Sequence, residues 1–226
     1  MKKYTLYFLV FFTAFFATFV YTFPIKNLLS FYANKFGFEY SKIDGNLFKI
    51  TIKDLSYKDL YIKTLSLHNK LIFMDIFVDK DKLADINLLD KSLVIKANKL
   101  QIEEFQKKPK IYGNLDLYLN IFVKDNYILS EGKGKITLKK VSFIPFASNL
   151  NIDFSIKNRP PKNFINISIR GAQIDYAINA DLILPLDKKQ IILNGISQGK
   201  IFGRNVKQKI DIDFIKGIIN KNLYLN

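Results

Sequence analysis

Apolar and polar residues alternate along most of this chain after Gly37, and this period of two constrains the fold more than any other feature. The clearest run covers residues 111–123, where isoleucine, leucine and valine occupy most odd positions and polar or aromatic residues occupy the even ones. Further runs lie at 47–53, 152–156, 165–169, 174–184 and 209–215. Successive side chains of a strand point to opposite faces, so each run predicts a β-strand with one apolar face.

Turn-forming residues separate these runs. Residues 44–46 precede the first run, and the prolines at 160–161, which cannot donate ladder hydrogen bonds, separate two later ones. The apolar set moves from odd to even positions across Gly171, which predicts a turn or a bulge there. We therefore expect an all-β fold over residues 37–226, built as an antiparallel curved sheet or as a trough-like sandwich. Residues 79–91 are the least clear part and are open to a short helix.

The N-terminal residues carry a second strong signal, because the sequence has no charged residue from Tyr4 to Phe23. About twenty helical residues at about 1.5 Å each span the roughly 30 Å hydrocarbon core of a membrane. Lys2 and Lys3 precede the run, which by the positive-inside rule keeps the N-terminus in the cytoplasm. We therefore predict that residues 1–23 are a single-pass transmembrane anchor and that the rest of the chain lies outside the cytoplasm. A cleaved signal peptide is the alternative, but bulky residues occupy the region where cleavage requires small ones.

The segment that follows, residues 24–36, predicts a short amphipathic helix. Pro24 suits the first turn of a helix, and Gly37 suits its end. Apolar residues recur between them at helical spacing: Ile25, Leu28, Leu29 and Tyr32. The sequence leaves open whether this helix lies at the membrane surface or caps the β-rich domain.

Composition narrows the chemistry. The chain has no cysteine and a single histidine, His68, so it offers no disulfide framework, no thiolate and no multi-histidine metal site. His68 is interpreted as a turn residue. No phosphate-binding glycine loop or serine-nucleophile elbow is present in the sequence, and the carboxylate pairs at 103–104 and 211–213 are interpreted as solvated. We therefore expect no enzymatic activity, no cofactor and no metal.

The chain is strongly basic, with a formal net charge of +15. A basic surface often binds anionic partners, and the predicted anchor favours lipid headgroups over nucleic acid. The alternative is that abundant lysine, asparagine, isoleucine and phenylalanine reflect only the composition of the genome. The lysine pairs at 107–108 and 139–140 are interpreted as solvated, with contact to headgroups as the second interpretation.

Several phrases resemble the AsmA-like superfamily of bacterial envelope proteins, in which we include the type II secretion system protein N family. The first is the Gly45 turn followed by Leu47 and Phe48, which leads into the phrase at residues 52–57. Gly132, Gly134, Ile136 and Leu138 resemble a glycine-led strand start of these sheets, and residues 195–214 are similar to their closing strands. The resemblance implies a membrane-anchored β-sheet with an apolar concave face. Relatives are linked to outer-membrane lipid supply or to secretion.

The resemblance and the apolar stripes together lead to two functional hypotheses. The first is a protein of the inner membrane, with its C-terminal domain in the periplasm, that shields or transfers membrane lipid in an apolar β-groove during envelope biogenesis. The second is an accessory structural component of a type II secretion system or another envelope assembly machine, whose proteins are then its partners. The stripes can also form a closed core. The candidate lipid-facing residues are Leu115, Leu117, Leu119, Ile121, Ile165, Ile167, Ile169, Ile174, Tyr176, Ile178, Ile210, Ile212 and Phe214.

Overall fold

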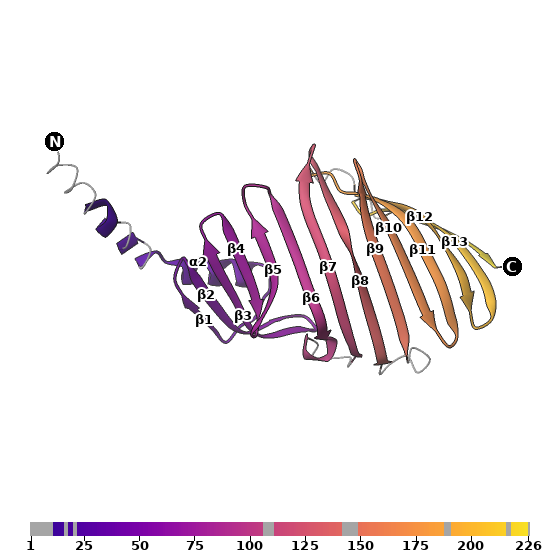
Figure 1. The fold of residues 1–226 in the computed structure, drawn as a ribbon, viewed down its shortest axis with the longest axis horizontal. Coiled ribbons are helices and arrows are strands. Elements are labelled where there is room, and N and C mark those ends of the chain that lie inside the picture. Colours follow the sequence, from indigo (N-terminus) through magenta and orange to yellow (C-terminus); the bar gives the residue numbers. More distant parts are fainter. Residues whose placement is uncertain are drawn as a thin grey trace. The chain divides into compact units, whose positions relative to one another are not determined.

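A computed structural model describes residues 11–15, 18–19, 22–105, 111–141, 149–187, 191–215 and 218–225. This part of the chain is mostly β-structure, and its strands form a single open antiparallel sheet whose spatial order follows the sequence (Figure 1). The strands are β1 (Lys42–Gly45), β2 (Lys49–Tyr57), β3 (Leu60–Lys70), β4 (Phe73–Val78), β5 (Asp81–Asn87), β6 (Ser92–Gln101), β7 (Ile111–Lys124), β8 (Tyr127–Val141), β9 (Leu150–Arg159), β10 (Lys162–Gly171), β11 (Ile174–Ile183), β12 (Ile192–Ile201), β13 (Arg204–Asp213) and β14 (Ile218–Leu225). The prediction of an antiparallel sheet is confirmed, and the described strands form one sheet rather than the two of a sandwich.

The contacts within the chain divide it into two compact units, residues 1–82 and residues 83–226. The prediction from the sequence was a single β-rich domain over residues 37–226. Each unit is described by itself below.

The strands β1 to β4 of residues 1–82 pair as an antiparallel meander. Residues that face each other across two strands share a face of the sheet. Ile43 lies opposite Ile52, Ile52 lies opposite Leu65, and Leu65 lies opposite Val78. Ile52 and Val78 are buried, so this apolar row forms the inner face of the unit.

Helix α2 (Ile25–Lys35) precedes β1 and contacts it. Ile25, Leu29 and Ala33 recur every four residues and are half-buried, so they mark the side that packs on the protein. Phe31 and Phe36 are each 62% exposed on the outer side. The segment predicted as a short helix thus covers part of the unit with one side and presents aromatic rings with the other.

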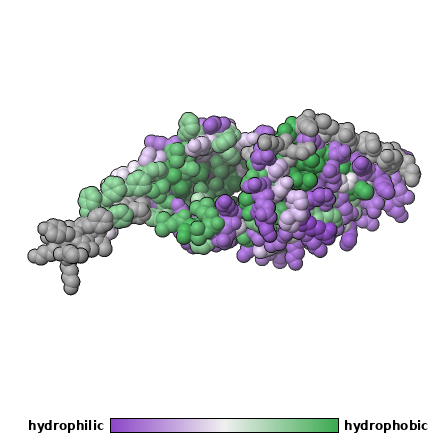
Figure 2. Space-filling view, turned by 90° about the horizontal axis from the view of Figure 1, so that it is seen from above, coloured by the Kyte–Doolittle hydropathy of each residue, from purple (hydrophilic) through white to green (hydrophobic). Residues whose placement is uncertain are grey.

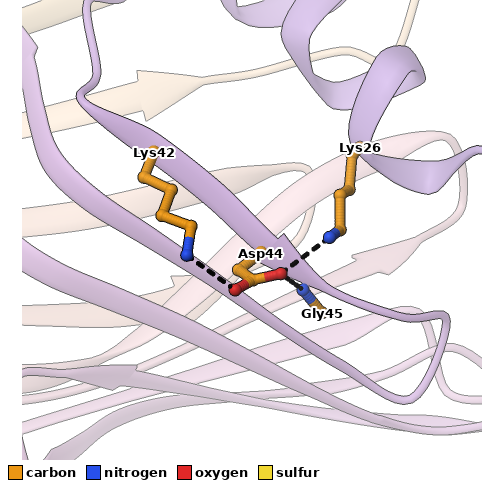
Figure 3. A network of polar contacts seen from close by, with 4 residues as sticks. All are labelled: Lys26, Lys42, Asp44 and Gly45. Atoms are coloured by element: carbon orange, nitrogen blue, oxygen red, sulfur yellow. Dashed lines mark hydrogen bonds and ion pairs between the residues drawn. The ribbon is translucent and has the colours of Figure 1, made fainter.

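The start of α2 is held to the end of β1 by the carboxylate of Asp44 (Figure 3). The Lys26 ammonium of α2 donates to Asp44 Oδ1 over 2.7 Å, and Lys42 lies 3.0 Å from Oδ2. The Gly45 backbone N–H also donates to Asp44 over 3.0 Å. The hydrogen bond from Lys26, followed by those from Lys42 and Gly45, holds the pKa of Asp44 well below its usual range.

The predicted anchor, residues 1–23, lies largely outside the described residues. Residues 11–15, 18–19 and 22 are helical. Within the described part of the chain, no helix has both the length and the apolar character to cross a membrane.

Three local expectations can be compared with the structure. Residues 81–87 form strand β5, so the short helix considered within 79–91 is absent from this described segment. His68 is a strand residue of β3 rather than a turn residue, and its ring lies 4.6 Å from that of Phe77. The turn predicted near Gly171 is confirmed, because residues 172–173 join β10 to β11. A hairpin in which Gly171 faces Ile174 shifts the apolar set from odd to even positions.

Candidate functional site

One face of the sheet in residues 83–226 is apolar across consecutive strands, and the strand register shows this directly. Leu115 of β7 faces Ile136 of β8, which faces Ile152 of β9. Ile152 faces Ile169 of β10, and Ile169 faces Tyr176 of β11. The even and odd stripes of the sequence therefore meet on a single surface, named here the apolar face.

All but one of the predicted lipid-facing residues lie on the apolar face. These are Leu115, Leu117, Leu119, Ile121, Ile165, Ile167, Ile169, Ile174, Tyr176, Ile178, Ile210 and Ile212. The remaining residue, Phe214, follows the last residue of β13 and is 54% exposed. Register rather than sequence distance brings the twelve together.

The twelve predicted residues on the apolar face are half-buried rather than buried. In a closed core they would be nearly inaccessible to water, as Leu129 of the same unit is. Neighbouring side chains on the same face cover them in part. The apolar face is thus accessible in the described part of the unit.

A groove of about 380 Å³ lies on the apolar face over strands β10 to β13. Its lining includes Ile165, Ile167, Tyr176, Ile178, Ala180, Leu193, Ile210 and Ile212. Gly195 lies in β12 between Ala180 and Ile210. A Cβ atom at Gly195 would lie 2.6 Å from the Cβ of Ala180, so a larger residue has no room there. Because Gly195 has no side chain, the groove is deeper at this point.

The groove floor also holds polar groups that bond within the protein. The Tyr176 hydroxyl donates to Ser197 Oγ over 2.7 Å, and Ser197 Oγ donates to the Gln208 carbonyl over 3.3 Å. Ser197 is only 2% exposed. Since both hydroxyl protons are used inside the protein, the floor acts mainly as an apolar surface.

One end of the apolar face is closed by a hydrogen-bonded cluster around Asn163. This side chain is fully buried at the start of β10. Its Oδ1 accepts from the backbone N–H of Ser130 over 2.6 Å, and its Nδ2 donates to the carbonyl of Ile128 over 3.0 Å. Both partners belong to β8, although β9 lies between β8 and β10 in the sheet. The sheet must therefore bend toward the apolar face, which carries Asn163.

Backbone hydrogen bonds also connect separate segments at this end of the apolar face. The N–H of Ile128 donates to the carbonyl of Leu184 over 2.8 Å, and the N–H of Leu186 donates to the carbonyl of Asn126 over 2.9 Å. These bonds connect the start of β8 to the chain that follows β11, across the tip of the β9–β10 hairpin. The bend of the sheet is thus fixed by main-chain and side-chain contacts together.

A small core closes the other end of the β9–β10 hairpin. Leu150 is buried there and packs against Ile111, Leu138, Ile169 and Ile174. Ile169 and Ile174 were predicted to face lipid, but part of their surface is used in this cluster. The most accessible stretch of the apolar face therefore lies between the Asn163 and Leu150 ends.

The opposite face is polar, and hollows there are larger than the groove. One of about 560 Å³ is lined by Asp175, Lys200 and Lys207, among others, and one of about 470 Å³ involves Asp116 and Lys135. Figure 2 shows hydrophilic residues along the lower side of the part that contains β7–β13. Size alone would favour these hollows, but charged side chains on an open sheet surface are the usual solvated face. The smaller apolar groove is the unusual feature.

The side chains with shifted pKa values lie in residues 1–82, in or next to the sequence segments that resemble AsmA-like proteins. Asp54 lies at a bulge of β2 with φ 51°. It accepts hydrogen bonds from Ser41 Oγ over 2.6 Å and from the Tyr61 hydroxyl over 2.7 Å. These bonds lower the pKa of Asp54, and the bond to Asp54 raises the pKa of Tyr61. The arrangement joins the two halves of the motif and acts as a structural clamp.

Sequence reasoning missed Asn163 and Ser130. Both occupy positions in phase with an apolar stripe, since Asn163 precedes Ile165 and Ile167 by even steps. A polar residue in apolar phase was the available signal, because a buried amide needs partners. Metal chemistry has no support among the described residues, where no group of three or more histidine and carboxylate side chains is placed to hold an ion.

The geometry defines a class: an open antiparallel β-sheet with one accessible apolar face that is bent and closed at one end. Comparisons of the chain with protein families, with characterised proteins and with solved structures find no match in any of the three.

Proposed function

We propose that this protein shields or transfers membrane lipid by holding acyl chains against the apolar face of its sheet. The accessible apolar face of residues 83–226 is the observation that carries the proposal. We further propose that residues 1–23 anchor the chain in the inner membrane and that the β-sheet lies in the periplasm, as in the AsmA-like proteins that the sequence resembles.

The energetics of the apolar face support binding of acyl chains. Each methylene that leaves water contributes about 0.8 kcal/mol, so ten buried methylenes contribute about 8 kcal/mol before ordering costs. Strands such as β11, with 10 residues, extend about 33 Å at about 3.3 Å per residue. That length accommodates an acyl chain lying along a strand.

A second function is favoured by the edge of the sheet. Strand β14 pairs with β13, and no other described strand covers its outer edge. An uncovered edge can accept a strand from another protein. The alternative proposal is therefore an accessory component of a secretion or envelope assembly machine, held by strand addition.

The test is mass spectrometry of lipids that co-purify with the full chain from a bacterial envelope in mild detergent. The variant Ile178→Asp places a carboxylate in the groove, where an unpaired charge opposes acyl chains. The matched control is Ile196→Asp, because Ile196 lies on the adjacent strand, faces the polar side opposite Asn179 and is 47% exposed.

We expect phospholipid to remain with the wild type and with Ile196→Asp, and to be reduced at least several-fold in Ile178→Asp. Equal amounts of lipid on the wild type and both variants would show that the lipid associates with the N-terminal anchor rather than with the groove, which would contradict the proposal. A lipid-free wild type that captures a stable protein complex would instead support the structural role.

A further inference from the structure

Two hairpin turns of residues 1–82 expose large apolar side chains at the same end of the strands. This side of the unit, where the β1–β2 and β3–β4 turns lie, is named here the apolar edge. Phe48, in the β1–β2 turn, is 41% exposed, and Leu71, in the β3–β4 turn, is 67% exposed. Beside Leu71, Ile72 is 40% exposed. The N–H of Asn69 donates to the carbonyl of Phe48 over 2.7 Å, so the two turns lie side by side.

Asparagine side chains shape both turns in the same way. Asn46 Oδ1 accepts from the N–H of Phe48 over 3.0 Å, and Asn69 Oδ1 accepts from the N–H of Leu71 over 3.0 Å. Such turns bond the backbone locally, as asparagine commonly does. The apolar side chain two residues later is left at the tip, where solubility alone would favour a polar residue.

The opposite edge of the same unit is charged. The β2–β3 turn is formed by Lys58 and Asp59, and the β4–β5 turn includes Asp79 and Lys80. In a meander, successive turns alternate between the two edges. The unit is therefore polarised, with apolar tips at one edge and ionised tips at the other.

The apolar edge is also where the N-terminal apolar segment reaches the unit. Lys26, three residues after Phe23, is bonded to Asp44 at the end of β1, immediately before the β1–β2 turn. The far end of α2 leads instead to the other edge, where the ring of Phe38 lies 4.9 Å from that of Tyr57. The predicted anchor and the apolar tips thus approach from the same side.

We propose that the tips at Phe48, Leu71 and Ile72 insert into the lipid bilayer that holds the anchor, so that this edge rests in the membrane surface. Apolar tips bury in the boundary of headgroups and acyl chains, and the exposed Lys49 beside them faces anionic headgroups, whereas the Lys70 ammonium is paired with Asp75 over 2.7 Å. The inference rests on the membrane attachment in the proposed function and adds an orientation to it.

The absence of cysteine from the sequence allows a direct test with single-cysteine variants of the full chain. Leu71→Cys and Phe48→Cys place an environment-sensitive fluorophore, nitrobenzoxadiazole, on the tips. The control Leu60→Cys labels a leucine that is 54% exposed at the start of β3, beside the charged β2–β3 turn. Each protein is reconstituted into vesicles of phosphatidylethanolamine and phosphatidylglycerol that contain lipids with spin-labelled acyl chains.

We expect the labels at 71 and 48 to shift to the blue and to be quenched several-fold more than the label at 60. Equal quenching at all positions in chains that float with the vesicles would overturn the inference and leave the attachment intact. Chains that do not float would overturn both. A blue shift without quenching by spin-labelled lipid would show that protein, either a second copy or a partner, covers the tips, which also rejects membrane insertion.

Discussion

Replacement of Asn163 by alanine provides a test of whether the bend of the sheet depends on one buried side chain. Asn163 is fully buried and bonds to two backbone groups of β8, the N–H of Ser130 and the carbonyl of Ile128. It also accepts from the Ser130 hydroxyl over 3.2 Å. Alanine removes the amide and leaves these groups facing an apolar surface.

The expected loss follows from those groups. A buried donor or acceptor without a partner costs about 1–3 kcal/mol. Two backbone groups therefore cost about 4 kcal/mol, and the Ser130 hydroxyl adds little because it can rotate to another acceptor. The loss is local first, because the bonds from Ile128 to Leu184 and from Leu186 to Asn126 connect the same segments.

Hydrogen exchange measured by mass spectrometry on the full chain in detergent reports this opening. A loss of about 4 kcal/mol raises exchange in peptides that cover 126–130 and 184–186 by on the order of several hundred-fold, if opening is local. The control Asn166→Ala changes the same residue type on the same strand at an exposed position, so it leaves exchange unchanged. Unchanged protection in Asn163→Ala would refute the argument that this amide fixes the bend.

Two further predictions follow from close contacts. Asp44→Asn weakens the contact with Lys26 and increases hydrogen exchange in the first turn of α2. In the wild type, the pKa of Asp44 is lowered from its usual value of 3.8. The stability that the ionised carboxylate contributes is therefore present above pH 3.8 and is lost only as the pH falls through the lower pKa of the folded state. The same exchange experiment run from pH 7 down to pH 3 on an intact wild type checks this, and loosening of α2 already near pH 6 would contradict it. Gly195→Ala brings a Cβ into contact with the Asn179 carbonyl and the Ala180 side chain and destabilises the protein by about 1–3 kcal/mol in denaturant unfolding; full stability would show that the strands have room to separate.

The strands and their apolar face could be predicted from the sequence because period-two patterning is a local property. Leu115 and Ile121 show their face within one strand, and the shift of phase across Gly171 is enough to locate the β10–β11 hairpin. The number of layers could not be predicted in the same way. A stripe of isoleucines is equally compatible with a closed sandwich and with an open sheet, since the difference lies in what covers the stripe.

The residues that shape the site were harder to predict because they break the pattern. Asn163 occupies an apolar phase, and its value depends on Ser130, which lies 33 residues away in sequence and two strands away in the sheet. Gly195 reads locally as a weak strand residue, and its role depends on Ala180 across the pair. Long-range register, which no single segment encodes, decides both.

The balance of polar groups on the apolar face bears on what kind of ligand it can select. The polar side chains at its closed end and on the groove floor form hydrogen bonds within the protein: Asn163 bonds to β8, and Tyr176 bonds to Ser197. A site that discriminates among headgroups needs unpaired donors or acceptors aimed at the ligand, because hydrophobic contact is non-directional. The apolar face therefore favours acyl chains as a class and gives little basis for choosing among headgroups. Under the proposed function, the choice of lipid then depends on the membrane into which we propose that the tips at Phe48 and Leu71 insert, rather than on the groove itself.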